Sequence, residues 1–119
     1  MPTPNSNQQL LAHILIGVPG SGKSTLAAQI SKLGNYEIIS TDEIREQIYG
    51  DAAIQGVWQE VESLVIQRIY DAFKAGKGIV YDATNFKRAF RLDFLQKVAE
   101  KIKQGEESNL NPVWLGWHL

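Results

Sequence analysis

The stretch of the sequence with the clearest chemistry is residues 17–25, which reads Gly-Val-Pro-Gly-Ser-Gly-Lys-Ser-Thr. It fits the phosphate-binding pattern G-x-x-x-x-G-K-[ST], in which glycines let several backbone N–H groups turn toward one anion at the start of a helix. In this pattern Lys23 reaches the β- and γ-phosphates of a nucleotide, and the Ser24 hydroxyl binds Mg²⁺. We therefore predict a nucleotide site formed by Gly17, Val18, Pro19, Gly20, Ser21, Gly22, Lys23, Ser24 and Thr25.

A second polar group, residues 40–45, follows a short β-prone run and reads Ser-Thr-Asp-Glu-Ile-Arg. Ser40 with Glu43 fits a capping box, so the start of a helix alone can explain the acidic residues. Asp42 is also placed to act as a base toward an acceptor hydroxyl, because it follows a strand end beside the phosphate site. Arg45 lies one helical turn later on the same face, which suits an acceptor that carries a phosphate. The spacing leaves both interpretations open.

The third group is residues 82–91, which read Asp-Ala-Thr-Asn-Phe-Lys-Arg-Ala-Phe-Arg. Asp82 closes an apolar run, and a carboxylate in that place is the usual Mg²⁺-side acid of a phosphate-loop protein. Thr84 and Asn85 fit either helix caps or contacts to an acceptor. Basic residues crowd the start of the next helix, where the helix dipole disfavours cations. This favours an anionic ligand beside Arg88 and Arg91, with a solvated charged face as the alternative.

The apolar pattern indicates the elements that must position these groups. Short apolar runs typical of buried strands occupy residues 10–16, 36–40, 79–81 and 112–118. Apolar residues at three- and four-residue spacing predict helices over 23–33, with Gly34 as the C-cap, over 42–49, from 57 to the glycines at 76 and 78, and from 90 to about 105. This order predicts an α/β fold with a parallel sheet covered on both faces. Ligands of such sheets bind beyond the carboxyl ends of the strands, where all three groups stand.

The composition is that of an ordinary globular domain, with 119 residues, 44% hydrophobic content and a net charge of −1. Without cysteine, a disulfide, a thiolate metal site and a catalytic cysteine are excluded. The longest apolar stretch is far shorter than a membrane span and lacks the basic flank of a secretory signal, so we expect a cytoplasmic protein. We predict a disordered leader over residues 1–9 and a single nucleotide-binding domain over 10–119.

Taken together, the motifs in residues 17–24, 40–45 and 81–85 resemble the P-loop kinases related to the kinase domain of polynucleotide kinase. That group includes bacterial AAA-type ATP-binding proteins and, more distantly, zeta toxins. The resemblance covers residues 10 to about 118. It implies a three-layer P-loop NTPase fold with strand order 2-3-1-4, and ATP and Mg²⁺ as cofactors.

The resemblance also assigns roles by position. It implies that Lys23 and Ser24 hold the ATP phosphates and Mg²⁺, that Asp42 is the general base, and that Arg45 contacts an acceptor phosphate. Asp82 matches the carboxylate beside the metal, and Asn85 matches a polar residue near the acceptor. In the family, the fourth strand leads to a lid helix with arginines that clamp the triphosphate. We find no such helix before Leu119 and expect a fold truncated after strand 4. Either the chain is a fragment or truncated product, or a partner or second subunit completes the site.

The favoured function is transfer of the γ-phosphate of ATP to a hydroxyl acceptor, such as a polynucleotide 5′-end, a nucleoside or a small alcohol. Lys23, Asp42 and Arg45 would be the catalytic residues. One alternative is a nucleotide-binding module or subunit with little catalysis of its own, because the lid is absent. Another is an NTPase that transfers the phosphoryl group to water.

Overall fold

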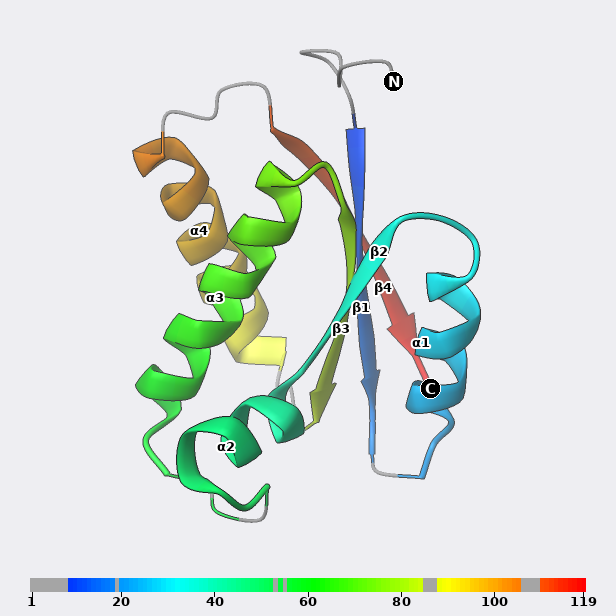
Figure 1. The fold of residues 1–119 in the computed structure, drawn as a ribbon, viewed down its shortest axis with the longest axis vertical. Helices are drawn as coiled ribbons and strands as arrows, with labels where there is room; N and C mark the ends of the chain where they lie inside the picture. The colour runs from blue at the N-terminus through cyan, green and yellow to red at the C-terminus, as the bar shows by residue number, and fades with distance from the viewer. Residues whose placement is uncertain (1–8, 19, 53, 55, 85–87, 106–109) are drawn as a thin grey trace.

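The computed structural model describes residues 9–18, 20–52, 54, 56–84, 88–105 and 110–119 (Figure 1). Strands and helices alternate along the chain in the predicted order. The elements are β1 (Gln9–Gly17), α1 (Lys23–Ser31), β2 (Tyr36–Ser40), α2 (Thr41–Tyr49), α3 (Trp58–Lys74), β3 (Gly78–Thr84), α4 (Arg88–Gln104) and β4 (Asn111–His118). Within these residues, no helix is long and apolar enough to cross a membrane.

The strands form one parallel sheet in the order β2-β3-β1-β4, which confirms the predicted topology. The central strands β1 and β3 pair over the register Ala12↔Ile79 to Gly17↔Thr84. Because all strands run the same way, their carboxyl ends meet at one edge of the sheet. The loops that leave β1, β2 and β3 therefore start close together, as the sequence interpretation required.

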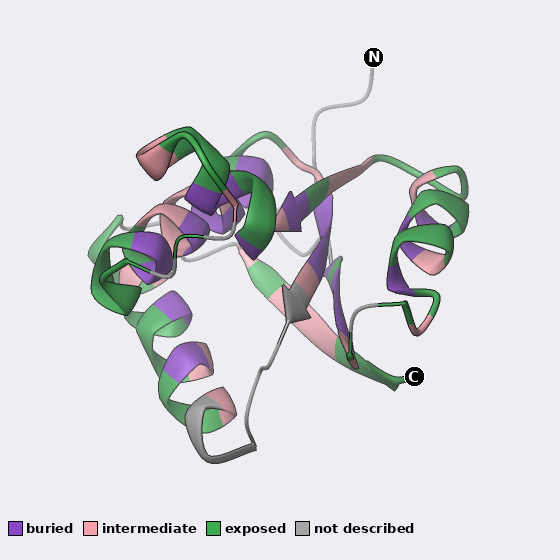
Figure 2. Ribbon diagram, turned by 90° about the horizontal axis from the view of Figure 1, so that it is seen from below, coloured by how far each residue is buried: buried purple, intermediate pink, exposed green. Residues whose placement is uncertain are grey.

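Helices cover both faces of the sheet in three layers (Figure 1). α1 lies on one face and α3 and α4 lie on the other, while α2 sits below the carboxyl ends of the strands. The larger core is between the sheet and the α3–α4 layer, and Figure 2 shows buried residues on the helix sides that face inward. The smaller core, on the α1 side, contains Leu15, Val80, Ala27 and Ile30.

The long helix α3 forms because its apolar residues recur at three- and four-residue steps. Val61, Val65 and Ile69 are completely buried, and Phe73 is nearly so. On the same face of the sheet, aromatic rings pack α4 against the strands. The ring of Phe94 stacks on Tyr81 with centroids 5.3 Å apart and meets Trp114 edge-on at 6.3 Å.

His13 is a buried structural residue inside β1. Its Nδ1 accepts a hydrogen bond of 3.0 Å from the indole Nε1–H of Trp117, and its Nε2 lies 3.5 Å from the Tyr36 hydroxyl. Burial lowers the pKa of the imidazole. Each ring nitrogen thus has a neighbour within the sheet, and His13 has no place in the chemistry of the opposite end of the strands.

Several boundaries differ from the sequence prediction by one to three residues, and two of them have a clear physical cause. α1 ends at Ser31 with Lys32 as the C-cap, and the N–H groups of Lys32 and Leu33 donate to the carbonyls of Gln29 and Ile30. Gly34 is therefore not the cap, and the side chain of Leu33 is 83% exposed. The predicted strand 79–81 runs on to Thr84, because residues 82–84 pair with the end of β1. Asp82 is therefore inside β3 and not in the loop after it.

Candidate nucleotide-binding site

The loop between β1 and α1 has the backbone geometry of an anion cradle. Gly20 and Gly22 have φ values of 84° and 96°, in the left-handed region where a side chain would be strained. The N–H of Ser21 donates to the carbonyl of Val18 at 3.1 Å, which closes a tight turn. Gly22 is the N-cap of α1 and has no side chain to occupy the first N–H groups of the helix. Those donors, at the positive end of the helix dipole, are suited to phosphate.

The first residue of α1 carries the buried cation of this site. Lys23 is only 5% exposed, and its ammonium lies 3.3 Å from Oδ1 of Asp82, whose side chain is 18% exposed. Oδ1 accepts no hydrogen bond from the described residues, so the carboxylate still has unused acceptor capacity. The ion pair links the phosphate loop directly to β3, as the predicted roles of the two residues require.

The sheet register explains why Asp82 reaches this point. Asp82 pairs with Leu15 of β1 on one side and with Ser40 of β2 on the other. It therefore stands between the strand that enters the phosphate loop and the strand that enters α2. Strand β3 is thus the element that brings the three sequence groups together.

At the end of β2, the helix α2 presents Asp42 and Arg45. Ser40 caps this helix by accepting from the N–H of Glu43 at 3.4 Å, as its sequence predicted. Nη1 of Arg45 donates to Oδ1 of Asp42 at 3.3 Å, so the two residues do share one face. The Asp42 side chain is 57% exposed, whereas that of Arg45 is 10% exposed. The carboxylate is thus open to an incoming acceptor, and the guanidinium is set below it.

A buried acid on α3 was missed in the sequence. Glu62 is 6% exposed, and its Oε1 accepts from Nζ of Lys97 at 2.5 Å. Burial raises the pKa of the Tyr81 hydroxyl. The negative charges of Glu62 and Asp82 raise this pKa further, and the positive charge of Arg45 lowers it. The hydrogen bonds to Glu62 and Asp93 raise the pKa of Lys97. The sequence did carry one signal for this acid. Glu62 lies three residues before Val65 and seven before Ile69, so helical spacing puts it on the apolar face of α3.

The other predicted site residues divide into those placed near the loop and those not described. Ser24 and Thr25 are exposed in the first turn of α1, and Val18 is exposed in the loop. Arg91 is partly buried in the first turns of α4, with an Nε that has no partner in the described part of the chain. Thr84 ends β3 and Arg88 begins α4, and only their backbones are described. Pro19 and Asn85 lie outside the described residues.

The residues of this site fit ATP with Mg²⁺. No group of three or more metal-ligating side chains exists in the part of the chain that the structure describes. Mg²⁺ does not need one, since it is commonly held by one or two protein oxygens together with the phosphates of the substrate. The Ser24 hydroxyl and the partly unsatisfied carboxylate of Asp82 are the protein oxygens that suit it.

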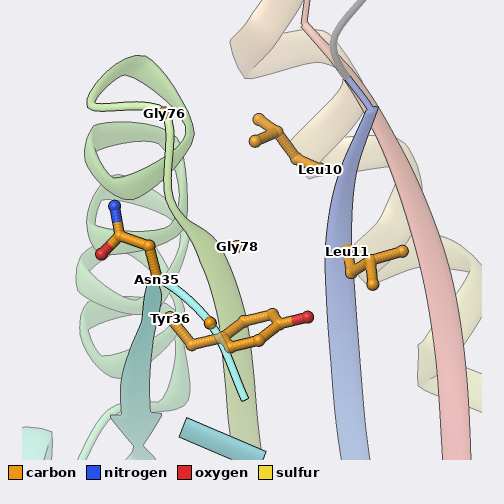
Figure 3. Close-up of a pocket in the computed structure, with 7 residues that line it drawn as sticks. Leu10, Leu11, Asn35, Tyr36, Gly76 and Gly78 are labelled. Atoms are coloured by element: carbon orange, nitrogen blue, oxygen red, sulfur yellow. The ribbon is translucent and has the colours of Figure 1, made fainter. Parts of the chain in front are cut away.

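A different hollow lies at the opposite end of the sheet (Figure 3). It is a shallow pocket of about 230 Å³ at the amino ends of the strands, where the ring of Tyr36 lies beside Gly78. A Cβ on Gly78 would come within 2.6 Å of both the carbonyl oxygen of Leu11 and the Tyr36 ring, so only glycine fits there. This pocket holds no charged side chain among its lining residues and is separate from the nucleotide site.

Comparison with known proteins agrees with this geometry. A family described as "AAA domain" matches residues 13–103. The chain belongs to this family. This AAA domain protein is of the P-loop kinase-like type. It shares 51% identity over 37 residues with a shikimate kinase of Clostridium botulinum. The match covers 31% of this chain and 22% of that enzyme.

Among solved structures, the AAA domain protein resembles a chain of the Pnkp1/Rnl/Hen1 complex with a TM-score of 0.64 at 23% identity, over 92% of this chain and 36% of that one. It resembles a protein proposed to be a kinase from Chloroflexus aurantiacus with a TM-score of 0.61 at 16% identity, over 91% of this chain and 59% of that one. These likenesses confirm the P-loop fold. The chain spans about a third of the first structure and under two thirds of the second.

Proposed function

We propose that this AAA domain protein is an ATP-dependent phosphotransferase that moves the γ-phosphate to a hydroxyl on an anionic acceptor. The proposal is supported by two pairs of charged side chains that lie at the same edge of the sheet. One is the buried Lys23–Asp82 ion pair at the mouth of the glycine loop. The other is the exposed carboxylate of Asp42 above the buried guanidinium of Arg45. The kinase relatives support the same class of reaction.

On the nucleotide side, the residues act by binding and orientation. The N–H groups of the loop at residues 17–22 and the Lys23 ammonium would receive the β- and γ-phosphates. Ser24 and Asp82 would hold Mg²⁺, which when bound neutralises charge on the phosphate oxygens. Thr25 is placed one residue further along α1 for the α-phosphate. Because Lys23 is already buried against Asp82, its position is fixed before the nucleotide arrives.

On the acceptor side, Asp42 would take the proton of the attacking hydroxyl at Oδ1 or Oδ2. Arg45 would bind a phosphate of the acceptor through the N–H groups that Asp42 does not use. We assign further acceptor contacts to Thr84, which ends β3, to Arg88 and Arg91 at the start of α4, and to Asn85. A polynucleotide 5′-end or a nucleotide fits these cations better than a neutral alcohol.

The neighbour in the Pnkp1/Rnl/Hen1 RNA repair complex works beside other proteins. By analogy, a partner or second subunit would supply lid arginines over the triphosphate bound to this chain. Such cations are worth about 10³-fold or more in kcat in related phosphoryl transfers. Addition of such a partner is therefore expected to raise the transfer rate.

The proposal is tested by following ³²P from γ-labelled ATP into pooled hydroxyl acceptors, both nucleotide and non-nucleotide. The Asp42→Asn variant should lose about 10²- to 10⁴-fold in transfer rate and keep its affinity for ATP. Glu43→Gln removes the adjacent acid of the same helical turn and should keep full activity. ATP binding with no transfer to any acceptor would favour the nucleotide-binding module, and release of label to water alone would favour an NTPase.

A further inference from the structure

Strand β4 forms a free edge of the sheet. In the order β2-β3-β1-β4, its one neighbour among the described strands is β1. The N–H of Leu119, just after β4, donates to the carbonyl of Ile16 in β1 at 2.8 Å. Because backbone groups point alternately to the two sides of a strand, the odd-numbered residues 113–117 also bond toward β1. The N–H and C=O groups of the even-numbered residues 114–118 therefore point away from the sheet.

β4 lacks most of the features that keep an edge strand from pairing with another chain. Such strands are usually short, charged, bulged or interrupted by proline. The opposite edge strand, β2, is five residues long and carries Glu37. β4 is eight residues long and contains no Asp, Glu, Lys or Arg, and its proline, Pro112, stands at its second position. The outward groups of residues 114–118 are thus open to another strand.

Apolar side chains beside this edge are open to solvent. Leu115 and Trp117 of β4 are 39% and 40% exposed, and Leu11 of β1 is 38% exposed. They lie on the α1 side of the sheet, because Trp117 pairs with Leu15, which belongs to the core on that side. α1 packs against the other three strands, and Figure 2 shows β4 exposed or partly exposed along its length. An apolar patch beside a free strand edge is typical of an interaction surface.

The sequence of β4 is complementary to itself in antiparallel pairing. With a twofold axis at Leu115, Trp114 lies opposite the partner's Gly116, and their outward N–H and C=O groups form a hydrogen-bonded pair. A Cβ on Gly116 would meet nothing within 4 Å among the described residues, so there is room beside it for the indole of Trp114. On the α1 side, Leu115 meets the partner's Leu115 and Val113 meets the partner's Trp117. No charged residue lies opposite a like charge, the arrangement that would prevent such pairing.

We propose that β4 is the interface of a homodimer, in which the β4 strands of two copies pair antiparallel and join their sheets. Both copies use the same patch, so the assembly closes as a dimer and does not grow into a fibre. The net charge of −1 adds little repulsion between the copies. One strand pair with a narrow apolar border is near the lower limit of specific interfaces, about 1,000 Å² in total, so we expect a micromolar Kd. The proposal does not rest on the phosphotransfer function.

The dimer is tested by sedimentation equilibrium of the whole chain from low micromolar to submillimolar concentration. The mass should rise from that of the monomer to twice that value. Leu115→Lys sets two ammonium groups opposite each other at the twofold axis, so it should weaken dimerisation at least about tenfold. Ile38→Lys, the matched control on β2, makes the same change at a residue that is 40% exposed and should leave the Kd unchanged. A wild type that stays monomeric at the highest concentration would overturn the proposal, and so would a dimer that Leu115→Lys leaves intact.

The register has its own test. A mixture of Leu115→Lys and Leu115→Glu places opposite charges at the axis and should dimerise more tightly than either variant alone. Absence of this gain would overturn the register centred on Leu115. If Leu115→Lys does not fold, Gly116→Pro removes one outward N–H without adding charge, at an edge position that tolerates proline. This variant should be monomeric, and a dimer as tight as that of the wild type would overturn strand pairing.

Amide hydrogen exchange separates strand pairing from association through side chains alone. As the concentration rises through the Kd, exchange at the N–H groups of Trp114, Gly116 and His118 should slow about tenfold or more, because each gains an acceptor on the partner. The N–H groups of Leu115 and Trp117 already bond toward β1 and should be equally protected at every concentration. Exchange at the three outward groups that does not depend on concentration would overturn the proposal.

Discussion

Replacement of Asp82 by Asn tests the ion pair that joins the phosphate loop to the sheet. The substitution keeps the size of the side chain and removes its charge, and it leaves the ammonium of Lys23 at 5% exposure without its carboxylate. Removing one partner of a buried ion pair is more damaging than removing both, because the other charge stays buried. We therefore expect Asp82→Asn to destabilise the nucleotide-free protein more than the double variant Lys23→Met/Asp82→Asn does.

The magnitude follows from the distance and burial of the pair. Two unit charges 3.3 Å apart attract by about 5 kcal/mol at an effective dielectric constant near 20, before the cost of desolvation. Exposed pairs contribute about 0–1 kcal/mol and the loss of one partner of a fully buried pair costs about 3–5 kcal/mol. With Asp82 at 18% exposure, this pair lies between those limits. We expect a loss of about 2 kcal/mol, or about 8 °C in Tm for a domain of this size.

The assay is urea unfolding of wild type, Asp82→Asn, the double variant and Asp71→Asn, an exposed control whose amide can still accept from Gln67. Metal-free ATP brings negative charge back to Lys23, so it should stabilise Asp82→Asn more than it stabilises the wild type. Equal stability of Asp82→Asn and wild type would refute the buried pair. So would a double variant that is as unstable as Asp82→Asn.

Three further substitutions test the packing. Phe94→Ala should cost about 3–5 kcal/mol in urea unfolding, because a fully buried ring that contacts Tyr81 and Trp114 is lost, and a cost below 1 kcal/mol would contradict that packing. Leu33→Ser should change stability by less than about 0.5 kcal/mol, since Leu33 is exposed, and a larger loss would place it in the core. The lowered pKa of His13 means that stability should fall as the pH drops below about 6.5, because the unfolded state then binds the proton more readily. In His13→Phe, the pH dependence of Tm between 7 and 5 should be weaker, and an identical dependence would contradict this assignment.

Much of the fold could be predicted because strong local signals agreed with it. The apolar runs in β1 and β2 and the apolar spacing of α3 predicted the correct elements, and the parallel order followed from their alternation. In β2, an edge strand, only Ile39 is buried. The predicted end of α1 was wrong, because Leu33 continues the helical spacing of Ile30 although its side chain is exposed. The predicted end of β3 was also wrong. Asp82 interrupts the apolar pattern, but its backbone pairs with both neighbouring strands.

The placement of the candidate site residues was predictable where a local sequence motif determines it. The glycine loop with Lys23 and the spacing of Asp42 and Arg45 are of that kind, and the structure brings each pair of groups to the expected sheet edge. The pairing of Glu62 with Lys97 was not predictable, because the two residues come from elements far apart in sequence. In sequence, a single acid on an apolar helix face does not show which cation pairs with it. The partner, Lys97, is identified only when α3 packs beside α4.

The most direct test of the nucleotide site is calorimetric titration of the protein with ATP in the presence and absence of Mg²⁺. We predict binding at one site that Mg²⁺ strengthens, and its loss in Lys23→Met while that variant still unfolds cooperatively. Undiminished ATP binding by a folded Lys23→Met protein, or no binding by the wild type, would contradict the account.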